Sequence, residues 1–237
     1  MIVMVRNSNH WRIDHSQILS RQEITLVLGD LKRRGLRSVN SRQNLAIFRL
    51  ATCCGCRASE IAGLRLQDIK ASLAQPYIYI SKAIAKRNKA RKIPLWWDRS
   101  TLDDLILWKA ERQQQGAKAE DYFVCVQSKR CFSQQLCRNN VRRRFQVACR
   151  VLGAERLVIG QDTYSATAQK QGQCYHKQLT IHHGRHSFCS HALAGGRSLA
   201  EVRDAAGHAD IATTSLYTHI VQDGGAMGHL FEFNGTG

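Results

Sequence analysis

The apolar residues of this chain follow a helical spacing over most of its length. Ser20 and Glu23 form a capping box, and the apolar positions after them predict a helix that ends at Gly35. The same spacing predicts further helices over residues 41–54, 59–63, 100–115, 133–152, 182–194, 199–206 and 210–218.

One section of the chain has the character of β-strands instead. Tyr77–Ile80 is rich in β-prone residues, residues 92–95 form a second such run, and the basic residues 82–91 between them predict a hairpin. A third short strand is predicted over residues 122–126. The predicted fold is therefore mainly α with a small antiparallel β-hairpin sheet. The predicted organisation is an N-terminal arm over residues 1–19, one domain over residues 20–219 with a loop or small hairpin at residues 154–178, and a tail over residues 220–237.

The overall charge points to a class of partner. Among 237 residues, 35 are Lys or Arg and 18 are Asp or Glu, which gives a formal net charge of +17. This excess predicts a polyanion, either nucleic acid or an anionic membrane surface. No apolar run reaches the roughly 18 residues of a membrane span, and the short, soon polar N-terminal segment does not resemble a signal peptide. The nine cysteines are an odd number, so we expect reduced thiols in a cytosol.

Part of the charge is concentrated in the predicted helix 133–152. From Lys129 through Gly153 there is no acidic residue, although seven Lys and Arg residues occur. A charge run often forms only a solvated helix face, but seven cations without one acid are better explained by contact with backbone phosphates. The arginines expected to contact DNA are Arg138, Arg142, Arg143 and Arg144.

Four separated segments carry residues that could act on a phosphodiester. They are the elbow after residue 54, the basic hairpin, the predicted helix 182–194, and the turn and helix after residue 206. His182 and Arg185 are three residues apart and share a helix face. The candidate catalytic residues are, in chain order, Arg57, Lys86, His182, Arg185, His208 and Tyr217.

These residue types suit phosphoryl transfer on DNA. Arginine can hold two non-bridging phosphate oxygens and match the charge of the transition state, and tyrosine can act as a covalent nucleophile. No carboxylate cluster with metal-ligand spacing is evident, which disfavours a two-metal nuclease. Each segment alone also has a plainer explanation. A histidine such as His182 commonly packs in a core, and a tyrosine such as Tyr217 commonly packs with its hydroxyl on a neighbour.

Taken together, the four segments resemble the tyrosine recombinase (phage integrase) family over about residues 18–220. The family patterns are T-G-x-R-x-S-E-[LI]-x-x-L, G-K-G-x-K-x-R-x-x-P-L, H-x-L-R-H-[ST]-[FA] and L-G-H-x-x-x-x-T-T-x-x-Y-[TS]-H, of which the last is very specific. The matching residues are Gly55, Arg57, Ser59, Glu60, Ile61 and Leu64; Lys86, Lys89, Arg91, Pro94 and Leu95; His182, Arg185, His186, Ser187 and Phe188; and Gly207, His208, Thr213, Thr214, Tyr217, Thr218 and His219.

The resemblance implies an enzyme that cuts and rejoins DNA as a site-specific recombinase or integrase. Tyr217 is expected to attack the scissile phosphate and form a 3′-phosphotyrosyl link with a free 5′-hydroxyl. Arg57 and Arg185 are expected to hold the non-bridging oxygens, and Lys86 to protonate the leaving oxygen. Because the covalent link conserves the phosphodiester energy, the resemblance implies that neither a metal nor ATP is required.

The remaining motif residues have supporting roles in the same resemblance. His182 is expected to act as a general base or a phosphate ligand, and His208 to hydrogen-bond the phosphate. Glu60 is expected to orient the neighbouring arginine, and His186 to pack against or brace the site. The hairpin residues expected to contact DNA are Lys89 and Arg91.

The chain departs from the family pattern at several places: Gly184 and Ala206 stand where leucine is common and suit packing changes, and two further departures bear on function. Ala85 and Arg87 stand where the hairpin pattern has glycine. Family members usually carry a DNA-clamping domain before the catalytic one, whereas some twenty residues precede the first helix predicted here. The chain is therefore similar to catalytic-domain-only recombinases of the fimbrial-inversion and Xer-like kinds.

The resemblance also implies partners and a location. The expected partner is double-stranded DNA with paired recombination sites, bound by a homo-oligomer from dimer to tetramer, with no membrane partner. The tail around Leu230 and Phe231 is expected to be exchanged between protomers. A prokaryotic cytoplasm, at the nucleoid, is the expected location, with a mobile element as the gene's setting.

Other interpretations stay open at this stage. A type IB topoisomerase-like nicking enzyme would use the same chemistry without paired sites, and a non-catalytic basic protein would only bind DNA. The cysteines around Cys54 and Cys131 could suggest zinc, but they lack a repeated C-x2-C pair and suit packing better. Trp96 and Trp97 could stack on bases, although packing is the plainer role.

Overall fold

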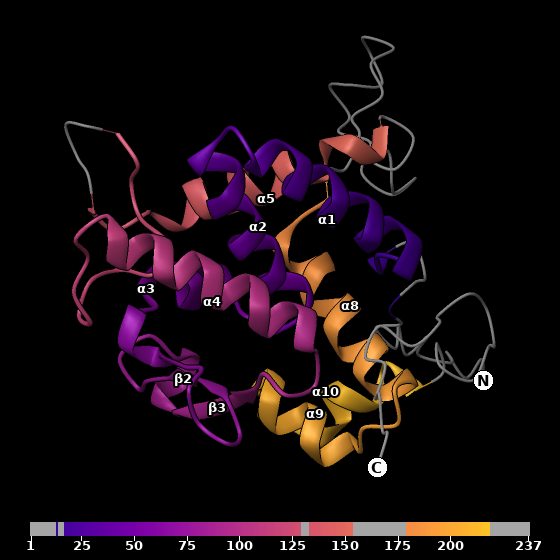
Figure 1. Ribbon diagram of the computed structural model, residues 1–237. Helices are drawn as coiled ribbons and strands as arrows, with labels where there is room; N and C mark the ends of the chain where they lie inside the picture. Colours follow the sequence, from indigo (N-terminus) through magenta and orange to yellow (C-terminus); the bar gives the residue numbers. More distant parts are fainter. Residues whose placement is uncertain (1–12, 14–16, 129–132, 154–178, 219–237) are drawn as a thin grey trace, which may run out of the picture.

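The computed structural model describes residue 13 and residues 17–128, 133–153 and 179–218. Its helices gather around a central helix, with a three-stranded antiparallel sheet at one side (Figure 1), so the predicted fold class is confirmed. The helices are α1 (Arg21–Gly35), α2 (Val39–Thr52), α3 (Ala58–Gly63), α4 (Arg99–Gln114), α5 (Arg138–Cys149), α8 (Ile181–Ala194), α9 (Leu199–Ala206) and α10 (Ile211–Ser215). The strands are β1 (Ile69–Lys70), β2 (Tyr77–Ile80) and β3 (Arg91–Pro94), and the short 3-10 turns are η2 (Leu66–Asp68), η3 (Lys86–Asn88) and η4 (Arg150–Leu152).

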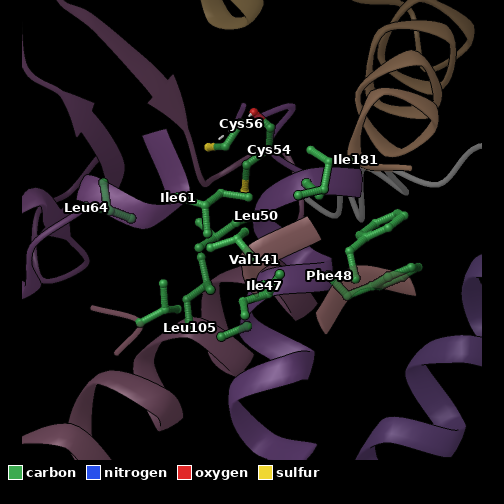
Figure 2. Close-up of a cluster of buried hydrophobic side chains, with 14 of the residues drawn as sticks. Ile47, Phe48, Leu50, Cys54, Cys56, Ile61, Leu64, Leu105, Val141 and Ile181 are labelled. Carbon is green, nitrogen blue, oxygen red and sulfur yellow. Dashed lines mark hydrogen bonds between the residues drawn. The ribbon is translucent and has the colours of Figure 1, made fainter. Parts of the chain in front are cut away.

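Helix α2 lies at the centre and contacts α1, α4, α5 and α8. Ile47, Phe48 and Leu50 of this helix are completely buried. Around them pack Ile61 of α3 and Val141 of α5 (Figure 2). Each fully buried side chain of this kind stabilises the fold by about 1.5–3 kcal/mol. Helices α3 and α8, which carry candidate site residues, are thereby fixed on one core.

Local signals in the sequence set the ends of α1. The Ser20 side chain accepts a hydrogen bond from the Glu23 backbone N–H (3.2 Å), and the Glu23 carboxylate accepts one from the Ser20 N–H (2.7 Å). This is the predicted capping box, and the helix ends at Gly35 as predicted.

The sheet has the order β1-β2-β3, and β2 and β3 form the predicted hairpin. Ile80 pairs with Arg91, so residues 81–90 form the basic loop between the strands. Within this loop Arg87 has φ +65° and Asn88 has φ +53°. Such positive φ angles lie in the left-handed region, which favours glycine. Arg87 stands at one of the two positions where the family pattern has a glycine.

Some predicted elements were wrong. Residues 122–126 form no strand, only isolated bridges from Tyr122 to Arg65 and from Cys125 to Gln135, because the chain bends at the buried Phe123 and Val124 between the two bridges. The helix predicted from residue 133 begins at Arg138, and the helix predicted over residues 210–218 ends at Ser215. Strand β1 was not predicted. The loop at 154–178 and the tail at 220–237 lie outside the described residues.

The described part of the predicted N-terminal arm packs against α8. Ile13 and Ile18 belong to a second buried cluster that also contains Tyr217. The Leu19 backbone N–H donates to the Ser187 hydroxyl (2.8 Å), and the Leu19 carbonyl lies 2.8 Å from the Nε2 atom of His191. Among the described residues, no helix combines the length and the apolar character that a membrane crossing needs.

Candidate active site

Arg57 is brought into place by a tight turn at the end of α2. Gly55 has φ +63°, and a Cβ there would lie 2.5 Å from Cδ1 of Phe188, so this turn requires glycine. The turn leaves Arg57 at the N-cap of α3, where its backbone N–H donates to Oε2 of Glu60 (2.8 Å). Its guanidinium donates to Oε1 of Glu60 (3.0 Å) and to the carbonyl oxygen of Gly207 (3.1 Å). Arg57 is therefore held on two sides with its side chain partly open to solvent.

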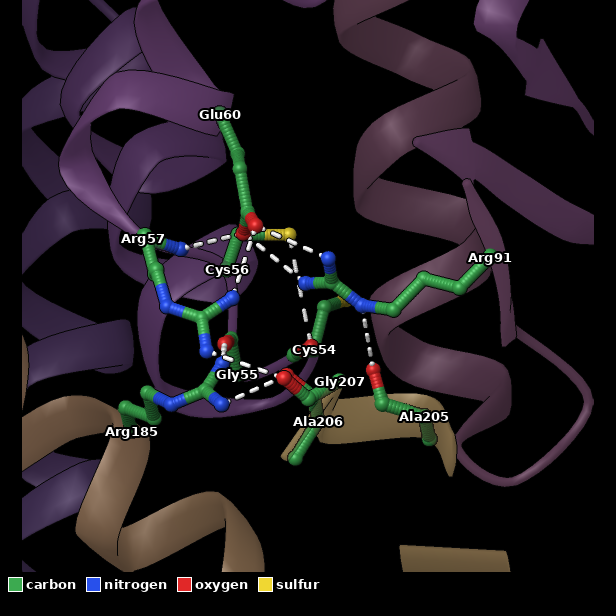
Figure 3. Close-up of polar contacts among 10 residues, drawn as sticks. All are labelled: Cys54, Gly55, Cys56, Arg57, Glu60, Arg91, Arg185, Ala205, Ala206 and Gly207. Carbon is green, nitrogen blue, oxygen red and sulfur yellow. Dashed lines mark hydrogen bonds and ion pairs between the residues drawn. The ribbon is translucent and has the colours of Figure 1, made fainter. Parts of the chain in front are cut away.

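Arg185 of α8 joins the turn before Arg57 to the end of α9 (Figure 3). Its guanidinium donates to the carbonyl oxygen of Gly55 (2.6 Å) and to that of Ala206. The residue is only 6% exposed. Burial, with a contribution from the nearby charge of Arg57, lowers its pKa from the ordinary arginine value. The guanidinium groups of Arg57 and Arg185 thus lie side by side, the first paired with Glu60 and the second hydrogen-bonded to backbone carbonyls. Two adjacent guanidinium groups attract an anion.

Three of the sequence candidates line one hollow of about 600 Å³. Arg57 lies on one wall, Lys86 of the hairpin on another, and His182 at the start of α8 on a third. Partial burial and the charge of Arg142 lower the pKa of His182, so its ring is neutral near pH 7. A neutral imidazole among cations can accept a proton or donate a hydrogen bond to a phosphate.

His208 and Lys86 line a neighbouring hollow of about 630 Å³ between the hairpin and the end of α9. His208 follows Gly207, the C-cap of α9 with φ +67°, and its Nδ1 lies 2.9 Å from the Thr214 hydroxyl. Burial first, and then the charges of arginines such as Arg185, lower its pKa to about 3. Lys86 is exposed and borders both hollows.

Tyr217 lies beside His208 but is hidden from solvent. Their rings are stacked, with centroids 6.4 Å apart and planes 4° apart. The tyrosine is 2% exposed, and its hydroxyl lies 2.6 Å from Nδ1 of His186. Burial, and then the nearby Cys189, raise the pKa of Tyr217 well above its ordinary value. The structure thus brings all six candidate residues together, with the hydroxyl of Tyr217 directed to α8.

Comparison with known proteins agrees with this geometry. The model of the phage integrase family matches residues 17–223. The chain belongs to the phage integrase family. It is 31% identical over 180 residues to the tyrosine recombinase XerC of Corynebacterium efficiens, an alignment that covers 76% of this chain and 47% of the relative. The chain therefore spans about half the length of this curated relative.

Solved structures show the same fold. The XerA recombinase superposes with a TM-score of 0.62 at 19% identity, covering 85% of this chain and 60% of that one. The XerH site-specific recombinase bound to its palindromic difH substrate superposes with a TM-score of 0.60 at 20% identity, covering 87% of this chain and 50% of that one.

Within this integrase domain, two residues lie beside Tyr217 that were not placed in contact with it from the sequence. His186 was expected only to pack against or brace the site, and Cys189 was not considered at all. Burial raises the pKa of the Cys189 thiol to about 11, while the charge of Arg185 and a hydrogen bond with Tyr217 act in the opposite direction. His186 and Cys189 are three residues apart on α8, so they share a face; the helical spacing was the only available signal.

The arginines of α5 that were expected to contact DNA line two different hollows. Arg138 and Arg142 line the hollow with His182. Arg143 and Arg144 line another hollow, of about 550 Å³, between α2 and α5. The guanidinium of Arg144 donates to the side-chain oxygens of two asparagines of α2, at 3.0 Å and 2.9 Å. These four residues therefore do not form a single cationic face.

The two hairpin residues expected to contact DNA, Lys89 and Arg91, lie in different surroundings. Lys89 is exposed and lines the hollow beside His208. Arg91 was expected to contact DNA, but its side chain is 8% exposed and donates through both terminal nitrogens to Glu60, at 2.8 Å each. Glu60 was expected to orient Arg57 only, but its carboxylate contacts both Arg57 and Arg91.

Of the cysteines at the elbow, Cys54 and Cys56 belong to the apolar core, while the Cys53 sulfur accepts a hydrogen bond from Arg49. Cys53, Cys54 and Cys56 are buried free thiols, and burial raises the pKa of Cys56 to about 12. Trp97 is buried and stacks on Phe188 with centroids 6.1 Å apart, while Trp96 is 43% exposed.

Proposed function

We propose that this chain cleaves and rejoins DNA strands as a site-specific recombinase, through a covalent bond between Tyr217 and a 3′-phosphate. The observation that carries the proposal is the convergence of Arg57, Arg185, His208 and Tyr217 from separate segments around the end of α9. Adjacent guanidinium groups with a tyrosine nearby suit a phosphodiester whose negative charge increases in the transition state.

Each side chain has a proposed role that follows from its position. Arg57 is partly open to the hollow and binds a non-bridging oxygen directly. Arg185 is buried and adds positive charge next to Arg57, while its hydrogen bonds fix the turn at Gly55 and the end of α9 at Ala206. Lys86 has a long, exposed side chain, and its terminal ammonium group protonates the leaving 5′-oxygen. The neutral rings of His182 and His208 hydrogen-bond the phosphate, and His182 also serves as the base.

Tyr217 has to leave its place before it can react. Its hydroxyl contacts His186 and Cys189, and the residue is only 2% exposed, so a phosphate cannot reach the hydroxyl there. We propose that DNA binding draws Tyr217 out into the hollow, where the arginines favour the phenolate form that burial disfavours. The polar partners on α8 then hold the enzyme inactive when DNA is absent.

The partners are proposed to be double-stranded DNA with paired recombination sites and further copies of this chain, from dimer to tetramer, on inverted half-sites. The related XerH structure contains a palindromic substrate, which supports paired half-sites here. Residues 20–219 are proposed to be the catalytic domain, with an arm before it and a tail exchanged between protomers after it. A cytoplasmic location at the nucleoid fits this function.

Trapping on a nicked duplex tests the cleavage step. A nick next to the cleavage point lets the short leaving strand diffuse away, so the covalent protein–DNA adduct accumulates. We expect an SDS-resistant adduct with the wild-type chain and none with Tyr217→Phe, while DNA affinity is nearly unchanged because only one oxygen is lost. Tyr79→Phe is the matched control, since Tyr79 is an exposed tyrosine of β2. An adduct with Tyr217→Phe would overturn the assignment of the nucleophile.

A second assay separates recombination from simple relaxation. Plasmids with two target sites are recombined by a site-specific recombinase, whereas a type IB topoisomerase-like enzyme relaxes supercoils on any plasmid. We expect products whose formation requires both sites. Relaxation of a plasmid without sites, and no exchange on the two-site plasmid, would favour the topoisomerase function.

A further inference from the structure

The last three carbonyl groups at the end of α9 are each bound by a different arginine (Figure 3). The Ala205 carbonyl accepts from Nε of Arg91 (2.9 Å), and the neighbouring Ala206 and Gly207 carbonyls accept from Arg185 and Arg57. These arginines come from β3, α8 and the start of α3. Carbonyl groups at a helix C-terminus lack helical partners and carry partial negative charge, so they attract cations.

Arg91 differs from the other two arginines in having a buried carboxylate as its main partner. Its terminal nitrogens donate to both oxygens of Glu60, at 2.8 Å each, while its Nε donates to Ala205. Such a bidentate pair fixes the plane of the guanidinium group. The three contacts engage both terminal nitrogens and the Nε of Arg91 at the edge of the hollow that Lys89 and His208 also line, and leave its side chain 8% exposed.

The same carboxylate aligns Arg57. Oε1 of Glu60 accepts from the guanidinium of Arg57, and Oε2 accepts from its backbone N–H. Glu60 itself is 0% exposed. Burial works against its charged form, yet the hydrogen bonds and charge of Arg91, with help from Arg57, lower its pKa to about 2. The carboxylate that holds Arg57 is therefore charged largely because Arg91 is present.

Arg91 also anchors the hairpin that carries Lys86. It is the first residue of β3 and pairs with Ile80 at the base of the loop. Its bond to the Ala205 carbonyl ties this base to α9, just ahead of the turn with His208. One side chain thus links the elements that present Lys86, Arg57 and His208.

We propose that Arg91 is a positioning residue for the cleavage reaction, which holds the Glu60 carboxylate in place beside Arg57 and fixes the hairpin to α9 without contacting DNA. The proposal rests on the proposed function. The other groups that face Glu60 are Arg57 on α3, the buried Cys56 thiol before it, and Arg185 on α8. Without Arg91, a buried carboxylate with fewer cationic partners becomes protonated at a higher pH.

The test compares Arg91→Ala with Lys89→Ala, a variant that removes one positive charge from the exposed part of the same hairpin. Two quantities are measured for each: the salt dependence of duplex binding, and the pH profile of single-turnover cleavage on the nicked duplex at saturating protein. We expect Arg91→Ala to keep the wild-type salt slope. Lys89→Ala is expected to lower it by about 0.9, the value for one phosphate contact.

The pH profile separates positioning from a general loss of structure. In Arg91→Ala the cleavage rate is expected to fall about tenfold per pH unit on the acid side, below the raised pKa of Glu60. This limb is additional to the one that the His182 base gives in every variant, and it should be absent from the double variant Arg91→Ala/Glu60→Gln, which has no carboxylate at position 60. Arg91→Lys should recover part of the rate, because it restores a positive charge beside Glu60 without the bidentate contact.

Several outcomes would overturn the proposal. A lower salt slope for Arg91→Ala would mean that Arg91 contacts a phosphate. A loss of rate that is equal at every pH, or an acid limb that is as steep and as high in pH in the double variant as in Arg91→Ala, would mean that Glu60 ionisation is not what Arg91 controls. Circular dichroism on each variant identifies any that fails to fold, in which case Arg91→Lys provides the comparison. Failure of the wild-type chain to form a Tyr217 adduct would instead count against the proposed function.

Discussion

The hydroxyl of Tyr217 lies 2.6 Å from Nδ1 of His186, on a helix face that also presents Cys189. Burial, with smaller effects from nearby histidines and Arg185, lowers the pKa of His186 to about 4, so its ring is neutral near pH 7 and can accept the phenolic proton. The proposed nucleophile is thus paired with a base while it is out of reach of DNA. The oxygen proposed to attack the phosphate is therefore the same atom that is hidden against α8.

A double-mutant cycle measures the strength of this pair. His186→Ala and Tyr217→Phe, alone and together, should show a coupling free energy of about 1 kcal/mol in urea unfolding, as expected for a buried hydrogen bond. His186→Ala alone should cost more than the coupling energy, because it leaves a buried hydroxyl short of a partner and opens a cavity. A coupling energy near zero would show that Cys189 alone satisfies the hydroxyl.

The buried histidines make stability depend on pH in a defined direction. Burial, as the main cause, lowers the pKa of His186 and His191 to about 4, below the unfolded value near 6.5. Between pH 4 and 6.5 the unfolded chain binds more protons than the folded chain. The free energy of unfolding therefore rises with pH in this range, and the stability is lost as the pH falls from 6.5 toward 4. Each histidine contributes at most about 1.4 kcal/mol per pH unit in this window. Urea unfolding at pH 7, 6 and 5 should show this decrease.

Replacing one histidine checks the source of the effect. His191→Gln can retain a hydrogen bond to the Leu19 carbonyl but cannot titrate. We expect it to be less sensitive to pH than the wild-type chain between pH 6.5 and 4. An unchanged pH dependence would show that other groups are responsible.

Arg87 in the hairpin is expected to carry backbone strain. Its φ of +65° is common for glycine and costly for other residues, by about 1 kcal/mol. Arg87→Gly should therefore be more stable than Arg87→Ala, although both variants lose the same charged side chain. Thermal unfolding of the two proteins gives the comparison. Equal stability would mean that the loop adopts a different conformation in solution.

Local signals were enough to predict much of the fold. The Ser20–Glu23 capping box and the alternation in Tyr77–Ile80 depend on neighbours along the chain, and the structure has both elements where the sequence predicts them. The motif spacing also selected residues that the fold brings together. The strand predicted over residues 122–126 failed because an apolar run alone does not show whether a partner strand lies beside it.

The orientation of side chains across the site could not be read from the sequence. Arg91 looked like one more hairpin cation, and only its approach to Glu60, 31 positions earlier, turns it inward. The pairing of Tyr217 with His186 likewise depends on how α8 and the turn after α10 pack. Charge and spacing identify which residues are available, whereas tertiary contacts decide whether each one faces DNA or the interior.

The division of arginines on α5 gives a final prediction about DNA contact. Arg138 and Arg142 line the hollow that also contains His182, so we expect them to contact phosphates of the duplex bound at the site. Arg144 lies between α2 and α5 and donates to Asn40 and Asn44, so it is expected to join these helices instead. Replacing Arg138 and Arg142 by Ala should lower the salt slope of binding by about 1.8, since each phosphate contact contributes about 0.9.

The matched variant replaces Arg143 and Arg144 by Ala, which removes the same charge from the same helix. We expect a salt slope closer to that of the wild-type chain and a lower free energy of unfolding, because the contacts of Arg144 with α2 are lost. Titrations of one duplex at several salt concentrations, with urea unfolding of both variants, make the comparison. Equal decreases in slope would show that DNA reaches both faces of α5, and unchanged slopes in both would show that these arginines form only a solvated surface. Because the two variants have the same net charge, any difference between their slopes reports on position and not on the overall field of the protein.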